Sequence, residues 1–179
     1  MESQERQQDW MIEKLMASAS TAPAELLEEV MADPRCPAFG PIHHFAVGAA
    51  LLAADLEEML ARSSSVPGAA CAKWGVCGAA ASAGMAYAIV RDNAPLREEG
   101  WQEGQLVVSD LLALIARSGR PRCCKRDSRV AAAAAVPHFN ALGGPQLAES
   151  DVVPTCASFP QNSVCMGQDC PFHPGNAGD

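Results

Sequence analysis

The chain has 179 residues, a formal net charge of −8, 49% hydrophobic residues and only 5% aromatic residues. This length suits one domain with a sizeable core, and an alanine-rich composition favours packed helices over a β-sandwich. The polar opening residues, MESQERQQDW, exclude a readable signal peptide, and the weakly apolar run 69–90 contains Lys73 and is too polar to span a bilayer. We therefore expect a cytoplasmic protein without membrane contact.

Helical spacing of the apolar residues predicts an all-α fold, a compact bundle of five or six helices. In chain order the helices are expected around 11–16, around 26–31 up to Pro34, from about 42 to 62, from about 78 to 90, from the DNAPL segment at 92–96 to about Gly119, and from Pro121 or the Asp127–Ser128 pair to Pro137. Small residues at four-residue spacing (Gly78, Ser82 and Ala86) indicate close packing of the fourth helix.

The last part of the sequence changes character. From 143 to 179 it is rich in Gly, Pro, Asn and Asp, has no helical period, and contains no Lys or Arg. We expect one domain, in which 1–142 form a helical body and 143–179 form an irregular, cysteine-rich tail packed on that body. Because phosphate contacts need basic residues, nucleic-acid binding through this tail is not expected.

Eight cysteines form the most informative feature of the sequence. In a reducing cytosol clustered cysteines are more often metal ligands or catalytic groups than disulfides, although any single one can be a small buried apolar residue. We treat all of them as candidate metal ligands: Cys36, Cys71, Cys77, Cys123, Cys124, Cys156, Cys165 and Cys170.

Candidate ligands in the body fall near expected helix starts. They are the pair His43–His44, the segment CAKWGVC with Cys71 and Cys77, and the pair Cys123–Cys124. Helix N-termini favour thiolates and anions, so we expect these cysteines and Cys36 to converge in space. His43 and His44 are possible additional ligands or acid–base groups.

The Cys123–Cys124 pair lies in the one dense basic segment, which carries six basic residues against one acid between 117 and 129. We expect Arg122, Lys125 and Arg126 to keep the thiols ionised by lowering their pKa, and to neutralise a cluster or a bound anion. The two cysteines are expected to do different jobs. A solvated basic helix end is the simpler alternative.

The tail carries Cys156, Cys165, Cys170 and His173, separated by eight, four and two residues. A segment without an apolar core of its own is explained by a metal crosslink, and Cys170-Pro171 is similar to the end of a ferredoxin-type ligand run. His173 is an alternative ligand or an exposed residue. One or two iron–sulfur clusters, of the 4Fe–4S kind, are therefore expected, with Cys123 or Cys124 completing the tail site and Cys36, Cys71 and Cys77 contributing to a second.

Two other functions stay open. A structural zinc site of three cysteines and His173 would make the protein a docking module with the basic segment as its surface. Alternatively, a metal-free thiol enzyme would use Cys123 or Cys124 as nucleophile and His43 or His44 as base.

The chain also resembles an uncharacterised domain family of roughly this length from anaerobic bacteria and archaea. The resemblance runs nearly end to end and rests on GPIHH, CAKWGVCGAAASAG, RCCKRDS and a tail of the form C…N…C…CPF. Some members of that family are joined to, or neighbour, methyltransferase-type domains. The resemblance thus implies redox, sulfur-transfer or one-carbon chemistry in an anaerobe, and a protein partner of methyltransferase or redox type.

Overall fold

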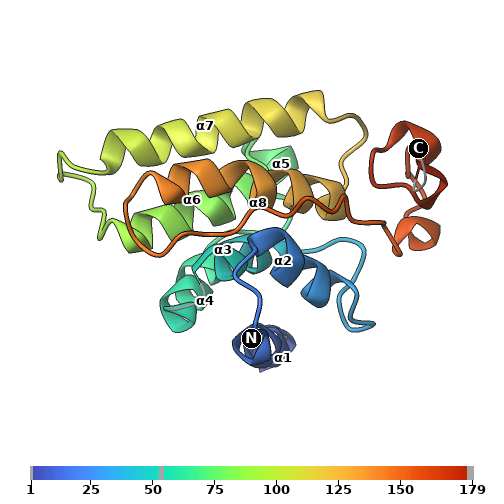
Figure 1. The fold of residues 1–179 in the computed structure, drawn as a ribbon, viewed down its shortest axis with the longest axis horizontal. Helices are drawn as coiled ribbons and strands as arrows, with labels where there is room; N and C mark the ends of the chain where they lie inside the picture. The colour runs from blue at the N-terminus through green and yellow to red at the C-terminus, as the bar shows by residue number, and fades with distance from the viewer. Residues whose placement is uncertain (1, 53–54, 177–179) are drawn as a thin grey trace.

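In the computed structural model, which describes residues 2–52 and 55–176, the chain is all-α, with eight α-helices and no strand in that part (Figure 1). The helices are α1 (Glu2–Ala17), α2 (Pro23–Met31), α3 (His43–Leu52), α4 (Leu56–Ser64), α5 (Ala70–Lys73), α6 (Gly78–Val90), α7 (Trp101–Arg117) and α8 (Cys124–Asn140). None of the helices in the described ranges is long and apolar enough to cross a membrane. The all-α fold is confirmed, but the expected number of five or six helices is too low.

Two local features account for the additional helices. The helix expected from 42 to 62 is divided into α3 and α4, and Asp55, just before α4, adopts a left-handed φ of 53° that ends helical geometry. The single-turn helix α5 overlaps the start of the CAKWGVC segment, where the sequence predicts no helix.

The expected boundaries of the last two helices also need correction. Helix α7 begins at Trp101, because the Asn93 side chain donates to the carbonyl of Gly100 (3.2 Å) within a loop instead of capping a helix. Helix α8 continues past Pro137 to Asn140. Pro137 and Ala133 are both exposed, so the Ala133 carbonyl, which loses its helical donor at the proline, can bond to water.

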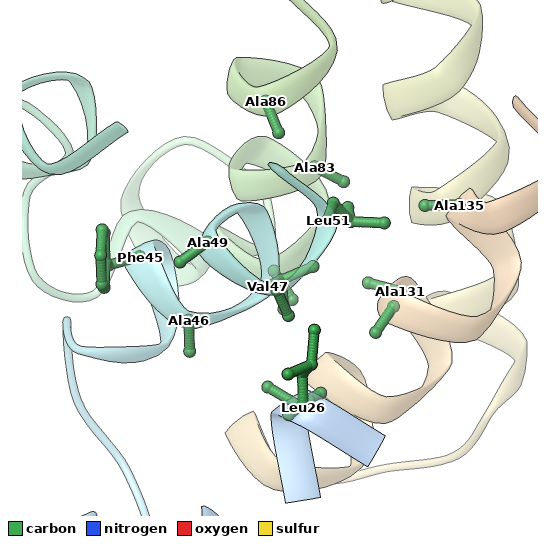
Figure 2. Close-up of a cluster of buried hydrophobic side chains, with 14 of the residues drawn as sticks. Leu26, Phe45, Ala46, Val47, Ala49, Leu51, Ala83, Ala86, Ala131 and Ala135 are labelled. Carbon is green, nitrogen blue, oxygen red and sulfur yellow. The ribbon is translucent and has the colours of Figure 1, made fainter. Parts of the chain in front are cut away.

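The core is centred on α3, whose residues His43 to Leu51 are all buried. Figure 2 shows α3 between α6 and α8, with Leu26 of α2 packed below. The small-residue face of α6 allows close approach: Ser82 Oγ accepts from the Gly48 N–H of α3 (2.8 Å) and donates to the Phe45 carbonyl (3.4 Å). The close packing expected for α6 is therefore present.

The tail, residues 143–176 as described, returns to the start of α8. Figure 1 shows the chain leaving the far end of α8 and running back along the body to the end where α8 begins. There it forms three single-turn 3-10 helices, η1 (Phe159–Gln161), η2 (Gly167–Asp169) and η3 (Pro174–Asn176). This path brings the tail cysteines to the Cys123–Cys124 pair.

Candidate functional site: two cysteine-lined cavities

The start of α8 divides the adjacent cysteines between two cavities. Cys123 is the N-cap residue, with an extended backbone (φ −140°, ψ 108°), and Cys124 is the first helical residue. Cys123 lines a cavity between the tail and α8, which we call the tail cavity. Cys124 lines a cavity among α3, α5, α6 and α8, which we call the body cavity. The expectation that the two cysteines do different jobs thus has a geometric basis.

Four thiols line the tail cavity, whose volume is about 20 Å³: Cys123, Cys156, Cys165 and Cys170, together with His173. Sulfur atoms here accept hydrogen bonds. The Arg126 N–H (3.5 Å) and the Asn162 amide (3.7 Å) donate to Cys123, and the Gly167 N–H donates to Cys165 (3.4 Å). Of the two candidates to complete this site, the structure brings Cys123 to the tail cysteines, and Cys124 faces the other cavity.

The tail has little apolar support around this cavity. Asn162 and Cys170 are its only buried residues among those described. Its order comes from polar contacts: the Cys156 N–H donates to the Phe172 carbonyl (2.7 Å), and the Asn176 amide donates to the Cys170 carbonyl (2.9 Å). His173 packs its ring against Phe159 at 4.8 Å between centroids, and its Nδ1 accepts from Gly175 N–H.

Three thiols, Cys71, Cys77 and Cys124, line the body cavity, which has a volume of about 260 Å³. Cys71 belongs to α5, and Cys77 is the N-cap of α6. The residue after Cys77 must be glycine, because a Cβ at Gly78 would overlap the imidazole of His44. The same ring therefore fixes how closely α6 begins against α3.

His43 also lines the body cavity and is 2% exposed. Its Nδ1 lies 3.2 Å from the Gly40 carbonyl, whereas Nε2 is buried without a hydrogen-bond partner among the described residues. Burial, reinforced by the positive charge of Lys125, lowers the pKa of His43 to about 3. Because a carbonyl can only accept, the neutral ring carries its proton on Nδ1 and leaves the Nε2 lone pair free. Burial also lowers the pKa of His44.

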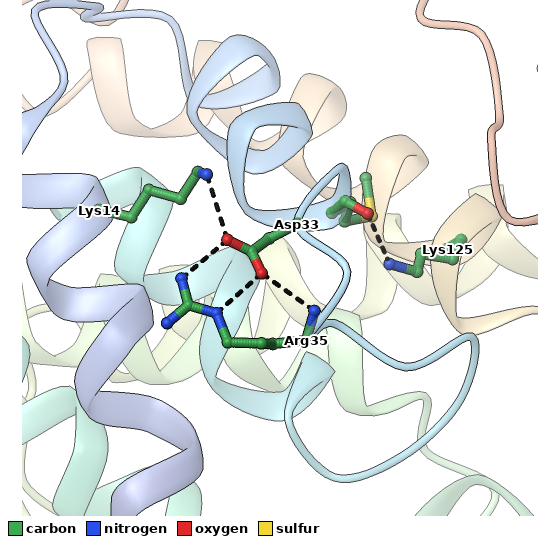
Figure 3. Close-up of polar contacts among 5 residues, drawn as sticks. Lys14, Asp33, Arg35 and Lys125 are labelled. Atoms are coloured by element: carbon green, nitrogen blue, oxygen red, sulfur yellow. Dashed lines mark hydrogen bonds and ion pairs between the residues drawn. The ribbon is translucent and has the colours of Figure 1, made fainter.

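Three cations of α8 are buried beside the tail cavity: Lys125 (1% exposed), Arg126 (3%) and Arg129 (6%). The ammonium of Lys125, labelled in Figure 3, donates to the Met31 carbonyl (3.1 Å) and to Cys36 Sγ (3.0 Å). It has no carboxylate partner in the part of the chain that the structure describes. The alternative of a solvated basic helix end is therefore wrong for Lys125, Arg126 and Arg129, whereas the other three basic residues of the segment, Arg117, Arg120 and Arg122, are exposed.

The two buried arginines have acidic partners. The Arg129 guanidinium binds Glu28 through two hydrogen bonds (2.6 and 2.8 Å) and lies 5.3 Å from the Phe172 ring. The Arg126 guanidinium lies 3.0 Å from Asp127 Oδ1 and donates to the sulfur of Met166 (2.9 Å) in the tail. The contacts with Met166 and Phe172 attach the tail to the two arginines of α8.

Arg122 is exposed at the rim of the body cavity. Its Nη1 donates to Cys71 Sγ (3.4 Å), and its guanidinium lies 5.5 Å from the Phe39 ring. Arg122, Lys125 and Arg126 thus each donate to a different cysteine, Arg126 through its backbone N–H.

The expected lowering of the thiol pKa does not occur at the three cysteines with a resolved shift. Burial raises the pKa of Cys77 to about 11 and also raises the pKa of Cys123 and Cys124, outweighing the nearby N–H groups and guanidinium groups. The sequence-based expectation counted positive charge and helix ends but could not count desolvation. A metal that binds these thiols must displace their protons.

The grouping of the body cysteines also differs from the expected one. Cys71 and Cys77 share a cavity with Cys124, whereas Cys36 is buried against Lys125 and lines neither cavity as described. Cys123 belongs to the tail cavity. Among the described residues, no three His, Cys, Asp or Glu side chains lie close enough to share a single metal ion.

Sequence reasoning missed several residues of the site. Arg129 could have been found, because it lies one helical turn after Lys125 and therefore shares its face of α8. Asn162 is the asparagine of the tail motif C…N…C…CPF, but the motif does not reveal its contact with Cys123. Met166 gave no signal, because its contact with Arg126 depends on the path of an irregular tail.

The fold and the two cavities define an all-α, cysteine-rich protein in which thiols gather at helix starts. The chain belongs to a family described as "Family of unknown function (DUF5714)", whose model matches residues 11–173. This match confirms the family resemblance found from the sequence motifs. No curated protein and no solved structure matches the chain.

Proposed function

We propose that the protein is an iron–sulfur protein whose tail cavity holds a cluster through Cys123, Cys156, Cys165 and Cys170. The observation that carries this proposal is the gathering of four thiols around one cavity, from segments up to about a quarter of the chain apart. Four cysteine thiolates are the usual ligand set of a 4Fe–4S cluster.

The charge around the cavity supports an anionic occupant. A metal centre with four thiolates carries net negative charge, and buried ions need a counter-charge. Lys125, Arg126 and Arg129 line the cavity, and Lys125 lacks a carboxylate partner among the described residues. The hydrogen bonds from Asn162 and from backbone N–H groups to sulfur are of the kind that tunes a thiolate-bound centre.

Zinc is the second candidate for the tail cavity. Its small volume of about 20 Å³ suits a single ion, and Cys₄ or Cys₃His sets, the latter with His173, are typical of structural zinc. The side chains would have to close around such an ion, because no three of them lie close enough to share it in the described residues. The protein would then be a docking module without catalysis. The metal-free thiol enzyme gains no support, because the pKa of Cys124 is raised by burial and that of His43 is lowered.

The expected role is redox, sulfur transfer or a step of one-carbon chemistry, together with a protein partner of methyltransferase or redox type. This role rests on the iron–sulfur proposal and on the family resemblance noted for the sequence. A partner of this kind would be recovered by anaerobic affinity purification and would depend on the loaded cluster.

Metal and sulfide analysis of the anaerobically purified protein tests the proposal. We expect iron and acid-labile sulfide in equal amounts and a brown colour, and we expect substitution of Cys165 by alanine to remove them from the tail cavity. Alanine is preferred to serine, because a serine oxygen can itself bind a metal. Stoichiometric zinc without sulfide would refute the iron–sulfur assignment and leave the docking module.

A further inference from the structure

The body cavity combines three thiols with an imidazole that is already prepared for ligation. Cys71, Cys77 and Cys124 come from three separate segments, and His43 comes from a fourth. None of these residues is needed for the tail cavity, which has its own four thiols. The body cavity is therefore a distinct candidate site.

His43 has the hydrogen-bonding arrangement of a metal ligand. A histidine that binds a metal through one ring nitrogen almost always donates its other N–H to a carbonyl, a carboxylate or water. His43 Nδ1 lies 3.2 Å from the Gly40 carbonyl, and its buried Nε2 has no partner among the described residues. A buried polar atom without a partner is costly, so its retention needs a reason.

The charges around the cavity are compatible with an anionic metal centre. The carboxylate of Asp127, which lines the cavity, is paired with the Arg126 guanidinium. Its volume of about 260 Å³ is far more than one ion needs. The Arg122 guanidinium reaches Cys71 Sγ (3.4 Å) from the rim, and Cys77 is the N-cap residue of α6, where the helix presents unpaired N–H groups. Ser128 Oγ, buried and also without a partner in the described part, lines the same space.

We propose that the body cavity holds a second iron–sulfur centre, ligated by Cys71, Cys77, Cys124 and His43 Nε2. The proposal takes from the proposed function only the kind of metal group, and it concerns different ligands. A neutral imidazole in place of a thiolate leaves the centre less negative, which raises its reduction potential. The two centres of the chain therefore differ in potential, with the body centre above the all-cysteine tail centre.

Adjacent substitutions provide a matched pair for the test. The protein is reconstituted anaerobically with ferrous iron and sulfide, and iron content, electron paramagnetic resonance spectra and mediated redox titrations are recorded. We expect Cys123→Ala to remove the low-potential centre and Cys124→Ala to remove the high-potential one, each with loss of about half of the iron. Cys36→Ala, at a buried thiol outside both cavities, is the control for folding and should keep both centres.

Substitutions of His43 test the fourth ligand. We expect His43→Cys to keep all the iron and to shift only the potential of the body centre to lower values, whereas His43→Ala should make that centre labile. Circular dichroism confirms that the variants fold.

Several results would overturn the inference. They are an unchanged iron content in Cys71→Ala, Cys77→Ala and Cys124→Ala, an unchanged potential in His43→Cys, or zinc in the body cavity. If Cys123→Ala lost iron and Cys124→Ala did not, the second centre would be refuted, whereas the proposal of a cluster in the tail cavity would stand. Absence of iron and sulfide from the wild-type protein would refute both.

Discussion

Acidification gives a direct measure of the neutral, buried imidazole of His43. In the folded protein, burial, with a contribution from Lys125, lowers its pKa from 6.5 to about 3. In the unfolded chain the imidazole regains its ordinary pKa. Between these two values the unfolded chain binds a proton that the folded protein does not bind. Stability is therefore fully present above the unfolded pKa and is lost as the pH falls below it.

The size of this loss follows from the two pKa values. Each pH unit below the unfolded pKa costs about 1.36 kcal/mol of unfolding free energy, so two units cost about 2.7 kcal/mol near pH 4.5. His43→Asn removes the titrating group and keeps an N–H donor for the Gly40 carbonyl. The wild type should therefore lose about 2.7 kcal/mol more than the variant between neutral pH and about pH 4.5.

Urea unfolding followed by circular dichroism at both pH values measures this difference. A chelator is present throughout, so that Nε2 is open to protons and metal release contributes nothing to the comparison. The buried amide oxygen of the variant costs the same at both pH values and cancels. Equal acid losses in the two proteins would show that the His43 pKa is not lowered and would refute the neutral imidazole.

Three further predictions concern the tail, the start of α6 and the buried charge. Cys165→Ala should let protease remove the tail while the helical body resists, as followed by mass spectrometry; equal resistance of both parts would contradict a metal crosslink. Gly78→Ala should lower the unfolding free energy by about 1–3 kcal/mol through overlap with the neighbouring imidazole, whereas Gly144→Ala, which has open space at its Cβ position, should change it little. Lys125→Met should release iron to a chelator several-fold faster than the wild type. Lys14→Met, at a partly exposed lysine, should not. Equal release rates would refute the role of Lys125 in compensating the charge of the cluster.

Much of the fold could be predicted because its helices carry local signals. The small-residue segment of α6 was placed at its observed bounds, 78–90, and the tail was recognised from its lack of periodicity. The separation of α3 from α4 was not predicted, because it depends on a left-handed backbone at Asp55. Such positions are usually occupied by glycine, and the sequence has none there. The start of α7 was missed because Asn93 is used within a loop.

The candidate site was predictable in its residue types and less so in its grouping. Spacing showed that three tail cysteines belong together, and adjacency showed that Cys123 and Cys124 cannot face the same way. Which cysteine faces which cavity depends on the residue at which α8 begins, and sequence patterns locate helix ends only to within a few residues. The burial of Lys125 and Arg126 could not be predicted from the sequence, because a basic segment normally lies on the surface of a protein.

The peptide bond between Cys123 and Cys124 gives the two cavities a common boundary. Fixing Cys123 against the tail also fixes the first turn of α8, and thereby the position of the Cys124 thiol. If both cavities hold metal centres as proposed, a change at one of them can alter the binding free energy at the other through this shared turn, and thermodynamic linkage requires any such effect to be equal in both directions.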